Sequence, residues 1–184
     1  MRVFFVFLLG LLIGCAGAPT EVRAPSKEDV AAGMQRKTVG LVQLEPDGVH
    51  VFCSGVWVGP KTILTAHHCV ADEDMGALVT YVTRNDVLDS DGGELFAPVT
   101  HPSAIVATDE AHDLALLCAR DLVSHDVAGL GPRPAVGSLA QAMGHSLGQW
   151  FSYSAGDVAA VRPMLVGDDT LMTWIQATTP ISPG

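Results

Sequence analysis

The feature that most constrains the fold is the repeated alternation of short apolar segments with glycine- and proline-containing turns. The chain has 19 glycines and 11 prolines, and they recur at short intervals between valine-rich segments. Turn sequences such as Pro46-Asp47-Gly48 and Gly59-Pro60-Lys61 separate segments whose length and β-branched content are typical of strands. The sequence therefore predicts an all-β fold.

The predicted strands fall into two blocks. The first block contains Thr38–Leu44, Val49–Val58, Thr62–Thr65, Ala77–Thr83, Leu95–Val99 and Asp113–Cys118. Residues 123–135 contain closely spaced glycines and prolines without a strand period, which is typical of a linker between two units. The second block offers Ser138–Met143, Phe151–Val161 and Thr170–Thr178, too few strands to close a barrel. We therefore expect one β-barrel over residues 37–122 and a partial one over residues 136–184.

The first residues resemble an export signal. Arg2 supplies a positive start, and the apolar run Val3–Ile13 is shorter than the roughly 20 residues that span a bilayer. The run ends in Leu12-Ile13-Gly14-Cys15, which resembles the lipobox of bacterial lipoproteins. Residues 1–14 are therefore predicted to be a signal peptide and Cys15 an acylated mature N-terminus. The alternative is ordinary cleavage after Ala18, although Pro19 is a poor residue after such a cut.

The next segment, residues 15–36, is rich in Ala, Pro, Glu and Lys and has no sustained strand or helix pattern. This composition is typical of a tether that holds a folded unit away from a membrane surface. We therefore expect a periplasmic or cell-surface protein that contacts the membrane through a lipid on Cys15.

The charge balance argues against a nucleic-acid partner. The chain carries 20 acidic residues against 10 Lys and Arg, a formal net charge of −10. A phosphate-binding surface has no electrostatic basis in such a chain. We therefore expect no nucleic-acid partner.

The most specific stretch runs from Phe52 to Val70 and reads FCSGVWVGPKTILTAHHCV. It resembles the histidine region of trypsin-like serine proteases, in which a half-cystine precedes an apolar strand and Leu-Thr-Ala leads into histidine and cysteine. The resemblance implies a disulfide between Cys53 and Cys69, which export to an oxidising compartment would permit. It also implies two six-stranded antiparallel barrels of the chymotrypsin type, the second incomplete in this chain.

A serine protease needs a neutral imidazole that accepts the proton of a poorly nucleophilic hydroxyl. His68 is the candidate base, because it directly precedes Cys69 as the family's histidine does. His67 departs from the family, which usually has a small residue there. The alternative reading, a surface pair or a metal site at His67-His68, lacks a third ligand at a recognisable zinc spacing.

The imidazole in turn needs a buried acceptor that fixes its tautomer and stabilises its charged form. Asp113 opens the segment Asp113-Leu114-Ala115-Leu116-Leu117, which resembles the family's aspartate motif. Taken alone, an acid in front of an aliphatic strand is more often an exposed strand end. The resemblance implies that Asp113 orients the imidazole.

The last residues, Thr179-Pro180-Ile181-Ser182-Pro183-Gly184, resemble the approach to the nucleophile in bacterial family members, where Pro-Gly is followed by one residue and Ser-Gly-Gly. On that alignment Gly184 contributes an N–H to the oxyanion hole, and the serine lies beyond the printed sequence. The resemblance implies a serine endopeptidase that cleaves protein or peptide substrates through a Ser-His-Asp triad without a cofactor. The 184 residues alone are expected to be inactive.

Two other functions remain open at this point. Gly144-His145-Ser146-Leu147-Gly148 also fits the G-x-S-x-G elbow of lipases and esterases, with Ser146 as nucleophile. That fold requires a histidine after the serine, and the last histidine here is His145. The third possibility is a protease-like binding lipoprotein without activity, against which the presence of His68 and Asp113 together argues.

Two smaller features complete the candidates. An acidic loop around Gly92-Gly93 could bind calcium but lacks the spacing of a defined calcium loop, and acidic loops are usually solvated turns. Its acidic residues are Asp86, Asp89, Asp91 and Glu94. Cys118 has no evident partner and is expected to be a buried free thiol.

Overall fold

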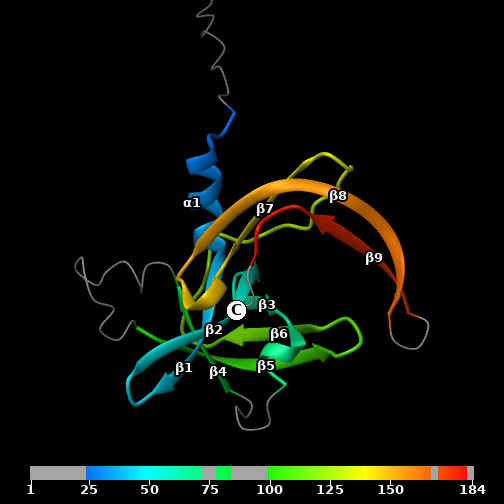
Figure 1. Ribbon diagram of the computed structural model, residues 1–184. Helices are drawn as coiled ribbons and strands as arrows, with labels where there is room; N and C mark the ends of the chain where they lie inside the picture. Colours follow the sequence, from blue (N-terminus) through cyan, green and yellow to red (C-terminus); the bar gives the residue numbers. More distant parts are fainter. Residues whose placement is uncertain (1–23, 72–77, 84–98, 167–169, 182–184) are drawn as a thin grey trace, which may run out of the picture.

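The computed structural model describes residues 24–71, 78–83, 99–166 and 170–181. Within these ranges the chain is mostly β-strand, with one α-helix at its start (Figure 1). The prediction of an all-β protein with one complete and one partial barrel is confirmed.

Six strands form a closed antiparallel barrel, called the barrel below, in the order β1-β2-β3-β6-β5-β4. The strand β1 pairs with both β2 and β4, and this second pairing closes the sheet and leaves no free strand edge. The strands are β1 Thr38–Glu45, β2 Gly48–Gly59, β3 Thr62–Thr65, β4 Leu78–Thr83, β5 His101–Asp109 and β6 Leu114–Ala119.

Side chains that alternate along these strands fill the barrel. Trp57 and Tyr81 meet edge to face with ring centroids 5.6 Å apart, and both are almost fully buried. A Cβ at position 55 would lie 2.6 Å from Cγ2 of Ile63, so glycine at this position leaves room for that core side chain. Cys69 belongs to the same buried cluster, which connects the core directly to the turn that carries His68.

Three further strands, called the second sheet below, follow the linker in the order β7-β8-β9. They are β7 Leu139–Gly144, β8 Ser152–Val166 and β9 Thr170–Ala177. Figure 1 shows β8 and β9 as a long curved hairpin arching above the barrel. Apolar side chains of this hairpin, including Leu165, Leu171 and Trp174, are exposed, as expected for a sheet that does not close into a barrel.

The helix α1, Lys27–Lys37, differs from the expectation of an irregular tether over residues 15–36. Its start is fixed by a capping box, in which the Ser26 side chain accepts from the Asp29 N–H and the Asp29 carboxylate accepts from the Ser26 N–H. Acidic residues in the first turn and basic residues in the last also favour the helix dipole. The sequence analysis overlooked these short-range signals because α1 has no buried apolar face.

The strand β5, His101–Asp109, is a second difference, since the sequence analysis expected the fifth strand at Leu95–Val99. Most of that segment lies outside the described residues. Pro102 near the start of β5 reads as a strand breaker, although proline is tolerated at the beginning of a strand. No helix in the described ranges is both long enough and apolar enough to cross a membrane.

Candidate active site

The pairing of two barrel strands brings the predicted base and acid together. Thr65 of β3 lies opposite Ala115 of β6 in the ladder. His68 follows shortly after Thr65, in the 3-10 turn η1, His67–Cys69, and Asp113 directly precedes β6. Residues separated widely in sequence therefore meet at one end of the barrel.

His68 and Asp113 contact each other through two hydrogen bonds. The backbone N–H of His68 donates to Oδ1 of Asp113 at 2.9 Å, and Nδ1 of the imidazole lies 2.8 Å from Oδ2. An ionised carboxylate only accepts, so Nδ1 carries the proton and Nε2 is left with a lone pair. The imidazole is thereby held in the tautomer that can accept a proton at Nε2.

The backbone at Asp113 is specialised for this contact. Its φ of 54° lies in the left-handed region, which aspartate tolerates better than most residues. Its N–H donates to the carbonyl of Glu110 at 3.2 Å and closes a turn in front of β6. This turn directs the carboxylate toward η1.

The electrostatics favour an ionised acid beside the imidazole. The pKa of Asp113 is lowered, first because the His68 backbone N–H donates to the carboxylate and second because the imidazole does so. The His68 side chain is 71% exposed, and in the described residues its Nε2 has no recorded partner. Most of the His68 side chain is therefore accessible to solvent. The Asp113 side chain is 53% exposed, which differs from the buried acceptor that the sequence analysis expects.

His67 makes no hydrogen bond in this arrangement, and its electrostatic interaction is the smallest of the causes that lower the pKa of Asp113. His67 is half-buried, and the structure records no hydrogen bond from its ring to any described residue. Of the two adjacent histidines, His68 is the one that contacts Asp113.

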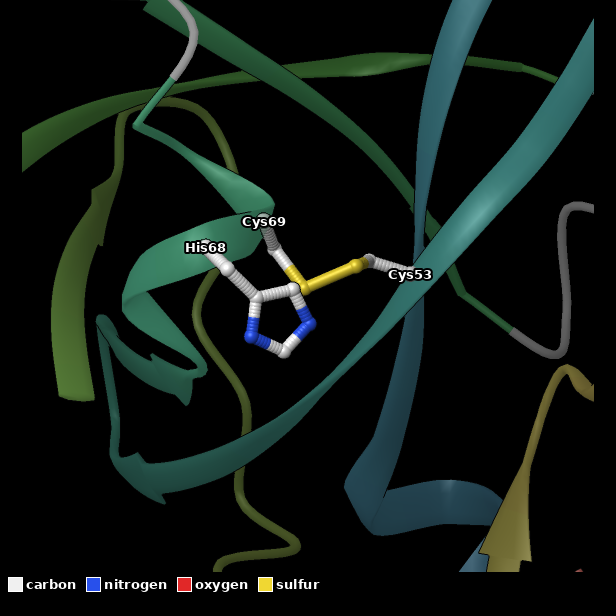
Figure 2. Close-up of side chains that lie close together, drawn as sticks. All are labelled: Cys53, His68 and Cys69. Carbon is white, nitrogen blue, oxygen red and sulfur yellow. A yellow bond between two sulfur atoms is a disulfide. The ribbon is translucent and has the colours of Figure 1, made fainter. Parts of the chain in front are cut away.

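A disulfide joins Cys53 on β2 to Cys69 in η1, with the two Cα atoms 6.1 Å apart. Figure 2 shows this bond running from the strand to the helical turn from which the His68 ring projects. The two sulfurs lie close to the His68 ring, but their mutual bond makes them unsuitable as thiolate metal ligands. The bond fixes the turn that positions the imidazole.

Removing this disulfide should destabilise the protein. Replacing Cys53 and Cys69 together by alanine should lower the free energy of unfolding by about 3 kcal/mol, because the loop between them is no longer closed in the unfolded chain. Urea unfolding followed by circular dichroism measures the difference. Cys118→Ser, which alters a free thiol, is the matched control, and an equal loss in that variant would contradict the assignment.

The esterase reading finds little support in the surroundings of Ser146. The serine begins the short 3-10 turn η3, Ser146–Gly148, which leads into the strand β8 and not into the helix that a nucleophile elbow needs. The neighbouring His145 points elsewhere, since its Nδ1 lies 3.0 Å from Oγ of Ser54. In the described part of the chain, the structure brings no histidine to Ser146.

The segment that leads toward Gly184 crosses back over the second sheet. Thr178 exchanges backbone and side-chain hydrogen bonds with Asp157, and the Thr179 hydroxyl lies 3.5 Å from the carbonyl of Ala140. Gly156 allows this approach, because a Cβ there would lie 2.5 Å from the Thr179 nitrogen. Figure 1 shows this red segment turning back from β9 toward β7.

Several predicted site residues lie outside the described residues. These are Cys15, Gly184 and the acidic loop residues Asp86, Asp89, Asp91 and Glu94. Cys118 lies within them and is free as expected, but it is half-buried where a buried thiol was expected.

Sequence analysis missed the contact between Ser54 and His145. The ring of His145 is 3% exposed, and burial lowers its pKa to about 4. The available signals were the small residue after Cys53 and a histidine in a glycine-rich turn, neither of which indicates a partner. The pairing depends on how the second sheet lies against the barrel.

Comparisons with known proteins agree with this geometry. The family model for the trypsin-like peptidase domain matches residues 53–184. No curated protein sequence matches the chain. Among solved structures, the HtrA-type protease AlgW with a decapeptide is similar with a TM-score of 0.67 at 17% identity, covering 87% of this chain and 53% of that one.

Two other solved structures share the fold. The MamO protease domain from Magnetospirillum magneticum matches with a TM-score of 0.56 at 21% identity, covering 80% of this chain and 74% of that domain. The inactive form of the Rv3671c protease matches with a TM-score of 0.63 at 15% identity, covering 84% and 71%. The chain thus spans about half the length of the HtrA-type protease. Because the family model covers well over half of its residues, the chain belongs to the family of trypsin-like peptidase domains.

Proposed function

We propose that this chain supplies the histidine and the aspartate of a serine endopeptidase. The observation that carries the proposal is the doubly hydrogen-bonded contact between His68 and Asp113, with most of the imidazole side chain exposed. A structural ion pair has no need of an accessible proton acceptor, whereas a general base does. The two HtrA-type structures were determined with a decapeptide and a tripeptide, which supports peptides as the substrate class.

In the proposed reaction, Nε2 of His68 accepts the proton of a serine hydroxyl as that oxygen attacks the peptide carbonyl. The carboxylate of Asp113 stabilises the imidazolium that forms and holds it in place. The imidazolium then donates its proton to the leaving amine, and the acyl-enzyme is hydrolysed by water along the same proton path. Backbone N–H groups near the nucleophile, that of Gly184 among them, would stabilise the oxyanion.

The serine is proposed to follow Gly184 by two positions in the full-length gene product. That protein should be labelled by a fluorophosphonate probe at this serine, and a chain ending at Gly184 should remain unlabelled, because its imidazole has no hydroxyl to activate. Mass spectrometry of the labelled peptide locates the adduct. Labelling of Ser146 would contradict the proposal and establish the esterase reading.

Lipid anchoring is a separate proposal that rests on Leu12-Ile13-Gly14-Cys15. In a bacterial host, the full-length protein should incorporate a fatty-acid probe and fractionate with membranes. Cys15→Ser should abolish both, because acylation requires the thiol, whereas Cys118→Ser should change neither. Absence of the probe from the unaltered protein would contradict anchoring and leave the proposed reaction unaffected.

A further inference from the structure

The barrel and the second sheet meet at a tight junction formed by β1 and β2 on one side and by β7 and η3 on the other. Two glycines allow the close approach. A Cβ at Gly40 would lie 3.1 Å from Nε2 of His145 and 3.2 Å from the Trp150 ring, and a Cβ at Gly144 would lie 3.1 Å from Oγ of Ser54. These contacts are tighter than ordinary packing, so neither position accommodates a side chain without displacement.

Hydrogen bonds between Ser54 and His145 connect the two sides of the junction. Oγ of Ser54 accepts the backbone N–H of His145 at 3.1 Å and lies 3.0 Å from its Nδ1. One hydroxyl on β2 therefore holds both the backbone and the ring of a residue that follows directly after β7. A hydrogen bond buried at such a site is costly to leave unmade.

The His145 ring lies in an apolar setting. Its centroid is 5.7 Å from that of Trp150 and 4.7 Å from that of Phe151, in edge-on arrangements. Gly40 of the barrel lies beside Nε2 of the ring. No charged group contributes to the lowered pKa of the imidazole, which is caused by burial alone.

This setting accepts only a neutral imidazole. Nε2 is buried and has no hydrogen-bond partner in the described residues. In the neutral ring, Nδ1 pairs with Ser54 and Nε2 is left without a partner, which costs less than burying a charge. In the imidazolium, Nε2 would carry a proton and a positive charge against Gly40 and Trp150 with no acceptor.

We propose that His145 is a positioning residue. Its neutral ring, hydrogen-bonded to Ser54, holds the second sheet in a fixed position against the barrel, and this pair of residues is called the Ser54–His145 lock below. The lock thereby fixes the position of the sheet relative to His68 and Asp113. Ser54 directly follows Cys53, whose disulfide partner Cys69 directly follows His68. Two peptide bonds and one disulfide therefore connect Ser54 to the base His68. The effect on catalysis rests on the proposed function, whereas the lock itself does not.

The catalytic arm of the test uses the full-length protein. Ser54→Ala removes the side-chain bonds, and His145→Phe keeps a buried ring without them. Each should lower kcat about 10²-fold through misplacement of the reacting groups, with KM changed less than about two-fold. The double variant should be no worse than either single one, because both remove the same lock. His125→Phe, at an exposed histidine in the linker, is the matched control and should leave kcat unchanged.

His145→Asn separates positioning from packing. The asparagine amide can occupy the place of Nδ1, so this variant should retain kcat within about five-fold of the unaltered protein. Wild-type kcat in both Ser54→Ala and His145→Phe would overturn the proposal. A loss of kcat in His145→Asn as large as that in His145→Phe would also overturn it, because such a result would indicate a role in packing alone.

The second arm observes the lock directly, without substrate. Fluorine NMR of protein labelled with 5-fluorotryptophan reports on Trp150, whose signal is assigned with Trp150→Phe. On acidification this signal should change with a midpoint near pH 4, where the His145 ring takes up its proton, and it should not titrate in His145→Phe. A Trp150 signal that does not change on acidification of the unaltered protein would contradict the proposed role of His145. If the full-length protein hydrolyses no peptide, the proposed function fails, while this arm still decides the inference.

Discussion

Replacing His68 by alanine in the full-length protein should reduce kcat roughly 10⁶-fold, the loss expected when a triad loses its general base. Without the imidazole, the serine keeps its proton during attack, and only binding and the oxyanion hole continue to contribute. The residual rate should therefore remain above that of uncatalysed hydrolysis. Single-turnover kinetics on a peptide substrate, with active-site titration of the unaltered protein, measure the change.

The chain provides two matched controls for this substitution. His67 is the immediate neighbour of His68, and no hydrogen bond from its ring to the described residues is recorded. His112 makes the same kind of contact with Asp109 that His68 makes with Asp113, through its N–H and its Nδ1 at 3.1 Å and 2.8 Å. Alanine at either position should leave kcat within about ten-fold of the unaltered protein. A large loss in His67→Ala with a tolerated His68→Ala would shift the base by one residue and contradict the structure.

The contact between His68 and Asp113 is predicted from the sequence by the resemblance of both motifs to the trypsin-like family, because a strand end alone does not distinguish an orienting acid from an exposed one. Thr65 and Ala115 fall within predicted strands, and the pairing of those strands alone brings the two motifs together. The sequence does not reveal that two aspartates of one turn each hold a histidine in nearly the same way. Asp109 contacts His112, and Asp113 contacts His68. Which of these pairs faces a substrate depends on three-dimensional placement.

The parts of the fold that sequence analysis missed share a physical cause. The helix α1 depends on capping by Ser26 and Asp29 at its start and lacks the buried stripe that periodicity analysis detects. The contact between Ser54 and His145 spans 91 residues and depends on the packing of two sheets. Local patterns encode strands, turns and caps, whereas the relative position of packed units is a long-range property.

Replacing Asp113 by asparagine should reduce kcat about 10⁴-fold while the fold is preserved. Asparagine has the same shape and also tolerates the left-handed backbone found here, with φ at 54°. Its carbonyl oxygen can still accept the His68 backbone N–H. Its NH₂ group would then donate to Nδ1, which places the imidazole proton on Nε2, so that Nε2 donates where the reaction needs an acceptor.

The measurement for Asp113→Asn is kcat together with thermal unfolding, so that loss of activity is separated from loss of structure. Asp109→Asn is the matched control, since it makes the same change to the neighbouring pair with His112 and should leave kcat nearly unaltered. Raising the pH should not restore Asp113→Asn, because the defect is the wrong tautomer and not the protonation of a carboxylate. Equal losses in both variants would mean that the turn requires acidic residues for its conformation, and the assignment of Asp113 as the orienting acid would then be wrong.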